Sequence, residues 1–495
     1  MKTFFTKSAL YLALTIPAFF FLGCDDSEEG GSYEFSVEPT VLTFSAKQET
    51  QTLSVRTYGD WSIVLPQDAA WLKVSAMSGR GPAEIEVTAE NYYRTDTSRT
   101  ARLTVTGGNS GDFHVEVVQR KLQMNDLSAA GKANCYIVPT SGDFVIDAAT
   151  QGNSESEQVG EWTSAELLWE DNRELITDLY GDPESKRIFF STAAAGNAVI
   201  AVKDASGKIL WSWHIWATDF DPNAKTLKYT NDNGSTWEFM DRNLGAANAE
   251  SGSFGAFGLL YQWGRKDPFT AATAFAPENP SETIRWNMLN NPLPAMASDA
   301  DSMGTVQLSI EHPTSFYVTR YAHGDWNGQP DPNLWGAVSG QKTVYDPCPA
   351  GWRVPAYDAQ GDSPYAFVTR QTTTGTDNIG RIYTDGNGND FLFPVAGSRV
   401  NGTGTLDCPG NYGSLWTATG KTTSNEDGTI EYGCLLFFTT GRLVSATYYD
   451  TRSQGVSVRC VKEGETERSV PSGRRSRVFS RFAFRFRTGF LRMRF

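Results

Sequence analysis

The sequence predicts a mainly β protein whose C-terminal part has an α+β character. Short runs in which apolar and polar residues alternate recur along the chain, for example Leu53–Val55, Ile85–Val87 and Leu103–Val105. A period of two is typical of half-buried strands. The chain also holds 46 Gly, which favours many turns, while long helical heptads are hard to find. Its 495 residues are enough for three or four domains.

The first 23 residues have the composition of an export signal. Two Lys precede an apolar run from Ala9 to Leu22, which is too short for a stable membrane span. The run ends in Gly23-Cys24, a junction that resembles the lipobox of bacterial lipoproteins. The resemblance implies cleavage after residue 23 and lipidation of Cys24. The alternative is an ordinary secretory signal that happens to contain a cysteine.

Residues 24–31 are acidic and end in two glycines, so we expect a flexible tether. The segment resembles the acidic export signal that follows the lipidated cysteine of Bacteroidota surface lipoproteins. This resemblance implies a protein that is lipid-anchored to the outer membrane and faces the cell exterior. An ordinary solvated linker is the alternative.

The charge of the chain argues against nucleic acid as a partner. The net charge is −14, and because nine Arg and no acid follow from Arg468 onward, the rest of the chain carries −23. None of the four His has a second His or a Cys at the spacing of metal ligands. Common catalytic and nucleotide-binding motifs are not found. The sequence therefore assigns no catalytic residue, no metal ligand and no cofactor, and predicts a protein that is not an enzyme.

Residues 32–121 contain six or seven short alternating runs, which predict a β-sandwich. The module resembles the BACON domain in Gly59-Asp60-Trp61, Trp71, Glu90-Asn91, the pattern Arg99-x-Ala101-x-Leu103 and the final Val117-Val118-Gln119. The resemblance implies an immunoglobulin-like sandwich that either binds carbohydrate or acts as a spacer. We favour the spacer, with Trp61 and Trp71 as apolar anchors rather than a ligand platform.

Residues 126–222 predict a second immunoglobulin-like sandwich. Two apolar runs joined by Asp204-Ala205-Ser206-Gly207 are typical of a hairpin. Trp211, Trp213 and His214 suggest a sugar-stacking site, but a strand buried on one side is the favoured interpretation. Cys135 lies in another apolar run, so we expect a buried, unpaired thiol.

Residues 225–463 carry an ordered set of motifs. It resembles the FISUMP-type major paralogous domains of Bacteroidota surface proteins and the C-terminal regions of some fimbrillin-like proteins. The resemblance implies a C-type-lectin-like domain whose chain ends lie on adjacent strands. The motifs are Phe239–Ala246, Gly258–Phe269, Asn333–Gly336, Tyr345–Pro355, Phe393–Arg399, Gly413–Ala418 and Gly455–Val461.

The cysteines of this region suggest two disulfides. If Cys24 is lipidated, five cysteines remain, and at least one must be unpaired. A bond between Cys348 and Cys460 fits the domain, and Cys408 with Cys434 would be the nested second pair found in lectin-like folds. Sequence alone allows three pairings among these four.

Long loops rich in Pro, Asn, Asp and Ser lie between Phe269 and Asn333, and we expect them to form a binding surface together with residues 402–412 and 422–428. The candidate ligand contacts are Trp286, Trp326, Tyr448 and Tyr449, because aromatic rings stack on the C–H faces of sugars. Trp335 and Trp416 lie within the family motifs and are assigned to the core. The segment 385–390 looks like a calcium loop, but Ala396 stands where the closing Glu is needed, so a hairpin turn is favoured.

Residues 464–495 alternate Arg with apolar side chains. Contact with anionic lipid or lipopolysaccharide would suit this pattern. The contrast with the acidic body fits a disordered tail or an artefact of the reading frame equally well, and the sequence alone assigns the tail no function.

These observations predict a non-catalytic surface lipoprotein that acts as an adhesin or binds carbohydrate or mucin. Its partner would be a glycan or glycoprotein. One alternative is a structural or tip component of a fimbria-like assembly, whose partner is another subunit and which an exposed edge strand in the second sandwich would favour. Another alternative is a hypervariable lectin-like display protein.

Overall fold

The computed structural model describes residues 35–464, with gaps at 95–96, 108–110, 275–277, 279, 297, 300–303, 319–323, 370–374, 378–379, 427 and 442. The predicted export signal, Cys24, the tether and the tail from residue 465 onward lie outside the described residues. The chain forms two compact units that divide after Leu122. We refer to residues 35–122 as the N-terminal unit and to residues 123–464 as the C-terminal unit. The regular structure of the described residues is almost entirely strands, which confirms the prediction of a mainly β protein.

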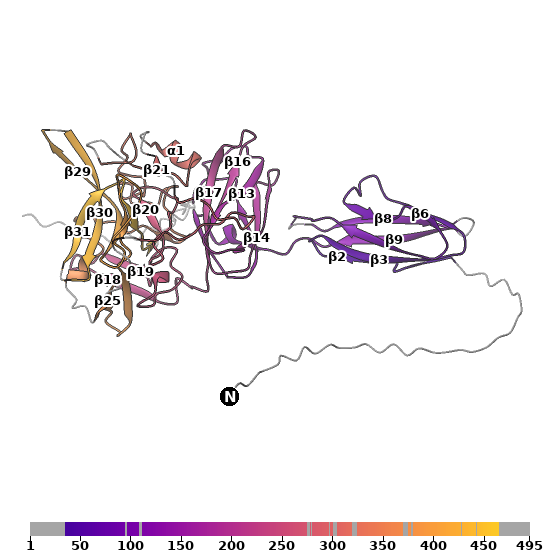
Figure 1. Ribbon diagram of the computed structural model, residues 1–495, viewed down its shortest axis with the longest axis horizontal. Coiled ribbons are helices and arrows are strands. Elements are labelled where there is room, and N and C mark those ends of the chain that lie inside the picture. Colours follow the sequence, from indigo (N-terminus) through magenta and orange to yellow (C-terminus); the bar gives the residue numbers. More distant parts are fainter. Residues whose placement is uncertain are drawn as a thin grey trace, which may run out of the picture. The chain divides into compact units, whose positions relative to one another are not determined.

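The N-terminal unit is a sandwich of two sheets (Figure 1). One sheet has the order β1-β3-β7-β5 and the other β2-β9-β8-β4-β6. The strands alternate buried and exposed residues, as the sequence pattern predicts. Their bounds are β1 Ser36–Glu38, β2 Val41–Phe44, β3 Glu49–Arg56, β4 Asp60–Val64, β5 Leu72–Val74, β6 Ser78–Arg80, β7 Ala83–Ala89, β8 Arg99–Thr106 and β9 Asp112–Gln119.

The two tryptophans of this unit have structural roles. Trp61 is buried, and its indole N–H donates to the carbonyl of Gly81 at 3.0 Å. Trp71 is half-buried, with the guanidinium of Arg99 lying 4.2 Å from its ring centroid. A small sandwich needs large apolar anchors, and both rings supply them.

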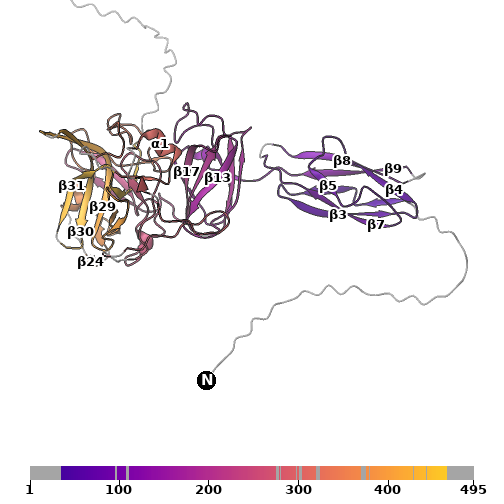
Figure 2. The ribbon, with the colours of Figure 1, turned by 45° about the horizontal axis from the view of Figure 1, so that its top comes forward.

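The C-terminal unit begins with a second sandwich. One sheet has the order β10-β12-β15-β14 and the other β11-β17-β16-β13, with a 3-10 helix, η2, at Leu127–Ala130. Figure 2 shows β13 and β17 in this part of the chain. The bounds are β10 Asn125–Asp126, β11 Cys135–Val138, β12 Gly142–Asp147, β13 Ser164–Glu170, β14 Ile176–Asp182, β15 Arg187–Thr192, β16 Gly196–Lys203 and β17 Ile209–Ala217.

Trp211, Trp213 and His214 are buried in β17, so they belong to the core and not to a sugar-stacking site. The expected burial on one side was wrong, because the adjacent residues Trp213 and His214 face opposite sides of the strand and both are buried. The His214 Nε2–H donates to Asn197 Oδ1 at 3.0 Å, and Asn197 Nδ2 in turn donates to Asp171 at 2.8 Å. Burial lowers the pKa of His214 to about 3, so the ring is neutral. Burial raises the pKa of Asp171 to about 6.

The rest of the C-terminal unit is arranged around two further sheets. The first has the order β18-β19-β33-β23, so strands from the beginning and the end of residues 225–463 are neighbours, with Phe239 opposite Val461. The second has the order β28-β27-β32-β29-β30-β31. The bounds are β18 Thr226–Thr230, β19 Thr236–Met240, β23 Trp352–Arg353, β27 Ser398–Arg399, β28 Leu406–Asp407, β29 Tyr412–Asn425, β30 Gly428–Thr439, β31 Val444–Thr451, β32 Gly455–Ser457 and β33 Val461–Lys462.

The remaining elements are short, and one of them, β20 (Leu260–Gln262), pairs with β32 and thus belongs to the second of these sheets. Within the described ranges the α-helix is short: α1 spans Val306–Glu311 and contacts β17. No helix of the described residues is long and apolar enough to span a membrane. The others are η3 Phe254–Ala256, β20 Leu260–Gln262, β21 Ser298–Asp299, β22 Phe316–Tyr317, η4 Ala366–Thr369, β24 Gly375–Asp377, β25 Gly380–Thr384 and β26 Asp390–Pro394.

The second sandwich and residues 225–463 share one hydrophobic core. Trp169 and Trp216 of the sandwich belong to the same buried cluster as Trp263, Trp335 and Trp416. These two predicted modules therefore form a single compact unit. The loop that contains Trp286 also links residues 225–463 to the second sandwich, because Trp286 and Glu170 exchange backbone hydrogen bonds at 2.8 and 3.0 Å.

One of the two predicted disulfides is present. Cys348 and Cys460 are bonded and buried, and their bond joins the segment before β23 to the segment before β33. Cys135 is a buried free thiol, as expected.

The predicted pair of Cys408 and Cys434 is wrong, since both are free. Tyr412 lies opposite Thr439 in the β29–β30 ladder. Cys434 is five residues from Thr439 along β30, which is about 17 Å at the rise of an antiparallel strand. Cys408 lies on the other side of Tyr412, so the two thiols are far beyond the reach of a disulfide.

The segment 385–390 is the hairpin turn between β25 and β26, as expected. The Asp385 carboxylate accepts the backbone N–H groups of Asn387 and Asn389 at 2.9 and 2.8 Å. Its oxygens are thus used within the turn. Among the described residues no group of three or more His, Cys, Asp or Glu is placed to hold a metal ion.

Candidate ligand-binding surface

Three long strands of the C-terminal unit, β29, β30 and β31, carry a group of neighbouring aromatic residues, of which Tyr448 and Tyr449 are exposed. β29 and β30 form a hairpin in which Asn425 lies opposite Gly428, and β31 pairs with β30 along the edge of the sheet. Figures 1 and 2 both show the three strands side by side. β31 ends the sheet, and its Ala446 carbonyl accepts the hydroxyls of Tyr357 and Ser363, so part of its outer flank is covered by that segment.

Five aromatic rings run across these strands in mutual contact, and we call them the aromatic row. From β29 to β31 the ring centroids of Tyr412 and Phe437 are 5.5 Å apart, and those of Phe437 and Tyr448 are 5.0 Å apart. Tyr448 stacks on Tyr449 at 6.2 Å, and Tyr449 meets Tyr432 edge-on at 5.0 Å. These separations lie in the favourable range for aromatic pairs.

The row is open to solvent at its β31 end. Tyr448 is 44% exposed and Tyr449 is 39% exposed, whereas Tyr412, Tyr432 and Phe437 are half-buried. Exposed aromatic rings that gather in one place are typical of interaction sites, while single exposed rings are common on any surface.

Polar groups border the row. The Lys421 ammonium lies 3.7 Å from the ring centroid of Tyr449. The Thr422 hydroxyl donates to the Glu431 carboxylate at 2.9 Å. At the β29 end the Tyr412 hydroxyl donates to Asp407 at 3.1 Å. Rings with hydrogen-bonding groups at their margin can hold a ligand that has both apolar faces and hydroxyls.

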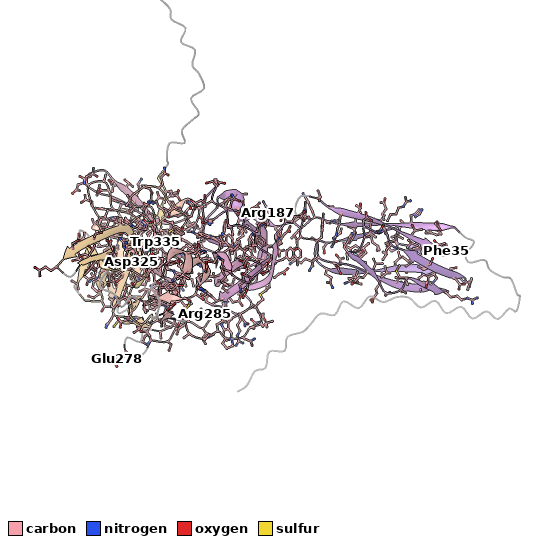
Figure 3. All side chains as sticks on the ribbon, turned by 90° about the horizontal axis from the view of Figure 1, so that it is seen from above. Phe35, Arg187, Glu278, Arg285, Asp325 and Trp335 are labelled. Atoms are coloured by element: carbon pink, nitrogen blue, oxygen red, sulfur yellow. A yellow bond between two sulfur atoms is a disulfide. The ribbon has the colours of Figure 1, made fainter. Side chains whose placement is uncertain are left out.

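A buried arginine fixes the strands beneath the row. Arg452 pairs with Asp325 and with Glu431, each at 3.0 Å, and its Nε–H donates to the carbonyl of Tyr432 at 3.2 Å. Burial raises the pKa of Asp325, which Arg452 opposes. Asp325 lies deep among the packed side chains in Figure 3. The row therefore rests on a rigid base, which limits the entropy lost when a ligand binds.

The predicted ligand contacts divide between surface and interior. Tyr448 and Tyr449 lie together on the surface, in the place that a ligand could reach. Trp326 is only 1% exposed, so its assignment as a ligand contact is wrong. Its indole N–H donates to the carbonyl of Trp263 at 2.7 Å, and its ring stacks on Tyr317, because this apolar ring completes the shared core.

Trp286 is half-buried and is not brought to the row. The Arg173 guanidinium lies 3.8 Å from its ring centroid, and its backbone pairs with Glu170 of the second sandwich. Its role as a ligand contact remains a prediction. Trp335 and Trp416 are buried, as expected, and Trp335 lies inside the unit in Figure 3.

The sequence did not single out Tyr432, Phe437 or Lys421 as members of this surface, whereas Tyr412 ends the segment 402–412 that was expected to help form it. The three residues lie up to 28 positions from Tyr449, and only the register of β29, β30 and β31 brings them together. The one local signal is the turn that joins β29 to β30, at Asn425–Gly428.

A family model matches part of the N-terminal unit. Residues 61–120 match "BACON: Putative binding domain, N-terminal". This match supports the resemblance to the BACON domain noted for residues 32–121. No curated protein matches the chain.

Solved structures match segments of the chain at low TM-scores. A Bacteroides ovatus GH5 xyloglucanase in complex with a heptasaccharide is 25% identical, with coverage of 22% of this chain and 27% of that one, at a TM-score of 0.17. A Bacteroides thetaiotaomicron protein is 19% identical over 21% of this chain and 100% of that one, at 0.15. The Escherichia coli chaperone DraB is 12% identical over 37% of this chain and 96% of that one, at 0.15. This chain spans about a quarter of the xyloglucanase.

Proposed function

We propose that this protein is a non-catalytic surface lipoprotein that binds glycans through the aromatic row. The observation that carries the proposal is the contact of five rings across β29, β30 and β31, with Tyr448 and Tyr449 exposed at the edge. The protein could serve as an adhesin or bind mucin-type glycoproteins. These two roles differ in where the glycan comes from, and both use the same chemistry at the aromatic row.

Carbohydrate suits this surface for two reasons. The C–H faces of pyranose rings are apolar and stack on tyrosine rings, and a row of rings can stack on consecutive sugars of a chain. Lys421 and Thr422 lie at the margin of the row, where the Lys421 ammonium offers hydrogen-bond donors and the Thr422 hydroxyl oxygen offers an acceptor to sugar hydroxyls.

The carboxylates near the row support binding rather than hydrolysis. Glycosidases need two carboxyl groups that flank the scissile bond. Glu431 is paired with Arg452 and accepts the hydroxyl of Thr422, and Asp407 accepts the hydroxyl of Tyr412. Both side chains are thus engaged in holding the row.

The sequence supports a place for the protein on the cell exterior. Lipidation at Cys24 and the acidic segment 24–31 would anchor the chain to the outer membrane. The N-terminal unit would then act as a spacer between the anchor and the C-terminal unit. A glycan or glycoprotein outside the cell is the partner that this arrangement favours.

The test is a glycan-array screen followed by calorimetry with the mature chain, in which Cys24→Ser prevents lipidation. We expect Tyr448→Ala and Tyr449→Ala each to weaken the binding of any glycan found by about tenfold or more, since stacking on one aromatic ring contributes on the order of 1 kcal/mol or more. Tyr58→Ala is the matched control, because Tyr58 is an exposed tyrosine of the N-terminal unit.

Two outcomes would overturn the proposal. Glycan binding that survives the Tyr448→Ala, Tyr449→Ala double variant would exclude the aromatic row. Loss of binding in Tyr58→Ala alone would place the site on the N-terminal unit.

A further inference from the structure

Among the residues that the structure describes, β11 of the second sandwich has a neighbouring strand on one side only. In the sheet order β11-β17-β16-β13, β11 stands at the edge and pairs in parallel with β17 among the described residues. The N–H groups of His214 and Thr218 donate to the carbonyls of Asn134 and Val138, at 2.7 and 2.8 Å. In a parallel ladder alternate residues face the neighbour, so Cys135 and Ile137 direct their backbone N–H and C=O groups away from β17.

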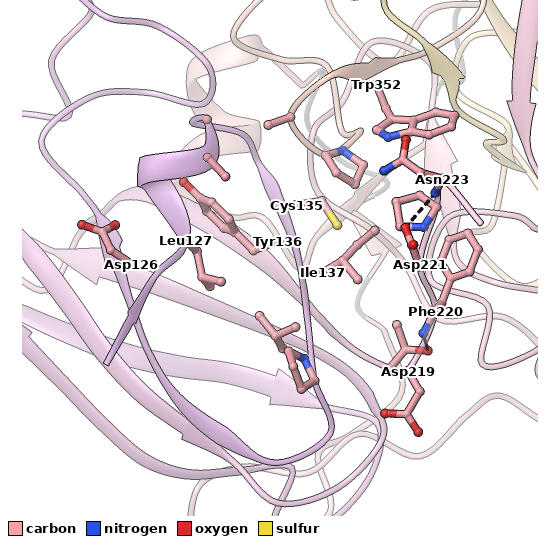
Figure 4. Close-up of a pocket in the computed structure, with 18 residues that line it drawn as sticks. Asp126, Leu127, Cys135, Tyr136, Ile137, Asp219, Phe220, Asp221, Asn223 and Trp352 are labelled. Carbon is pink, nitrogen blue, oxygen red and sulfur yellow. Dashed lines mark hydrogen bonds between the residues drawn. The ribbon is translucent and has the colours of Figure 1, made fainter. Parts of the chain in front are cut away.

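A groove of about 610 Å³ runs along this open side of β11. Figure 4 shows Leu127 and Tyr136 in one part of its lining, and Phe220 and Trp352 in another. The lining also contains three carboxylates and no Lys or Arg, and two of them, Asp219 and Asp221, are exposed. The groove thus combines an apolar lining, an acidic lip and backbone groups that are placed to pair with an added strand.

The described chain leaves the C-terminal unit beside this groove. The N–H of Glu463 donates to the carbonyl of Gly351 at 2.8 Å, and the neighbours of Gly351, Ala350 and Trp352, line the groove. Residues 465–480 separate this point from Arg481. An extended chain of that length reaches roughly 50 Å, so a segment that begins at Arg481 can return to β11.

The sequence of that segment complements the groove. If residues 481–487 form a strand, the alternation of the sequence would put Phe482, Phe484 and Phe486 on one side and three Arg on the other. The apolar side matches the lining, and the arginines match Asp219 and Asp221. The contrast in charge between the tail and the rest of the chain is thereby explained as the contrast between a strand and its groove.

We infer that Arg481–Arg487 of the same chain docks in this groove and adds a strand to the open edge of β11. Attachment beside the groove raises the effective concentration of the segment, which favours docking within one molecule over pairing between copies. The docked segment covers the edge that would otherwise pair with another chain. The inference is independent of the proposed glycan function.

The test is amide hydrogen exchange at β11, in the mature Cys24→Ser chain and in the same chain ending at Gly464. We expect the amides of Cys135 and Ile137 to exchange at least tenfold faster in the shortened chain. The amides of Tyr136 and Val138 point toward β17 and serve as the internal control. The shortened chain keeps every residue that is packed in the described fold, so unfolding should not confuse the result.

Two matched variants sharpen the test. Phe484→Pro removes a backbone donor from the middle of the docking segment and should give the exchange rates of the shortened chain. Phe495 lies outside the docking segment, in the later alternating run 491–495. The Phe495→Pro variant should therefore show the exchange rates of the unaltered chain. Raising the salt concentration should loosen the docked segment, because the Arg–Asp pairs are screened.

Three results would overturn the inference. The first is equal exchange at Cys135 and Ile137 in the full and shortened chains. The second is protection that grows with protein concentration and accompanies dimers in ultracentrifugation, which would mean pairing between copies. The third is tail-dependent sedimentation with phosphatidylglycerol vesicles and no change in exchange, which would make the tail a membrane contact.

Discussion

Trp416 and Tyr448 lie in one line across three strands, yet one is in the core and the other on the surface. Trp416 of β29 is opposite Leu435 of β30, and Leu435 is opposite Tyr448 of β31. Trp416 is fully buried, with its indole N–H donating to the carbonyl of Tyr261 at 2.8 Å, whereas Tyr448 is 44% exposed. Trp416, a core residue, and Tyr448, a candidate ligand contact, are thus only two strands apart in the sheet.

The comparison teaches that position in the sheet decides the role of each ring here. β29 is an inner strand, covered by the shared core that contains Trp263 and Trp335. β31 is the edge strand, and its two exposed rings pack on other rings of the aromatic row and, at Tyr449, on Lys421. The same physical property, a large apolar ring, therefore stabilises the fold at one end of the line and is available for recognition at the other.

The largest effect on stability that we expect comes from the buried disulfide of the C-terminal unit. Replacing both Cys348 and Cys460 with Ala opens a link between residues 112 positions apart, which lowers the free energy of unfolding by about 4 to 5 kcal/mol in the chain-entropy model. Urea titration followed by tryptophan fluorescence measures the loss.

The N-terminal unit gives an internal control for that experiment. Its residues 35–122 contain no cysteine, so its own unfolding transition should not change in the variant or under reductant. A variant with unaltered stability would show that packing, without the disulfide, is enough to hold the core around Trp416. The difference between this core and the edge strand β31 would then depend only on burial.

The second prediction tests the two ends of the line directly. Trp416→Ala should lower the free energy of unfolding by about 3 to 5 kcal/mol, because it removes a fully buried ring and leaves a cavity. Tyr448→Ala should change it by less than about 1 kcal/mol, because surface substitutions are mild. Thermal denaturation of both variants supplies the measurement, and equal losses would refute the proposed division of roles.

The sequence was sufficient for the pattern of strands and for several core residues. Alternating runs predicted the sandwich of the N-terminal unit, and the motif that contains Trp416 placed this residue in the core. The link between Cys348 and Cys460 followed from the family resemblance and is present. These features depend on local patterns or on motifs that can be read directly from the sequence.

The aromatic row could not be predicted in the same way. Tyr412, Phe437 and Tyr448 come together through the register of two strand pairs, which no short-range pattern encodes. Trp326 was assigned to the surface because it lies in a polar stretch, but its ring is needed to complete the shared core. The pairing of Cys408 with Cys434 failed for the related reason that the register places them far apart.

The third prediction concerns a buried group beside the tryptophans of β17. The pKa of His214 falls from 6.5 to about 3 on folding. Between about pH 3 and pH 6.5 the imidazole of His214 is therefore protonated in the unfolded chain and neutral in the folded one. The free energy of unfolding consequently decreases as the pH falls from about 6.5 toward 3. His214→Gln keeps an N–H donor for Asn197 and cannot titrate.

The difference in stability between the unaltered chain and His214→Gln should therefore depend on pH within that window and be constant above about pH 7.5. Urea titrations at a series of pH values measure this. Asp171 has its pKa raised to about 6, so its contribution has the opposite sign in both proteins and cancels in the difference. A pH-independent difference would show that His214 is accessible to protons in the folded state.

The smallest effect that we expect is at the margin of the row. Lys421→Met keeps the length of the side chain and removes the charge that lies 3.7 Å from the ring of Tyr449. An exposed cation–π contact contributes about 0.5 to 1 kcal/mol, so thermal stability should fall by no more than this. If Lys421 donates to a bound sugar, calorimetry should show a further loss of affinity of about tenfold, while Lys47→Met in the N-terminal unit should leave affinity unchanged. Affinity that rises in Lys421→Met would mean that the ammonium covers the ring and competes with the ligand, and the open edge at Tyr448 would then be the main contact.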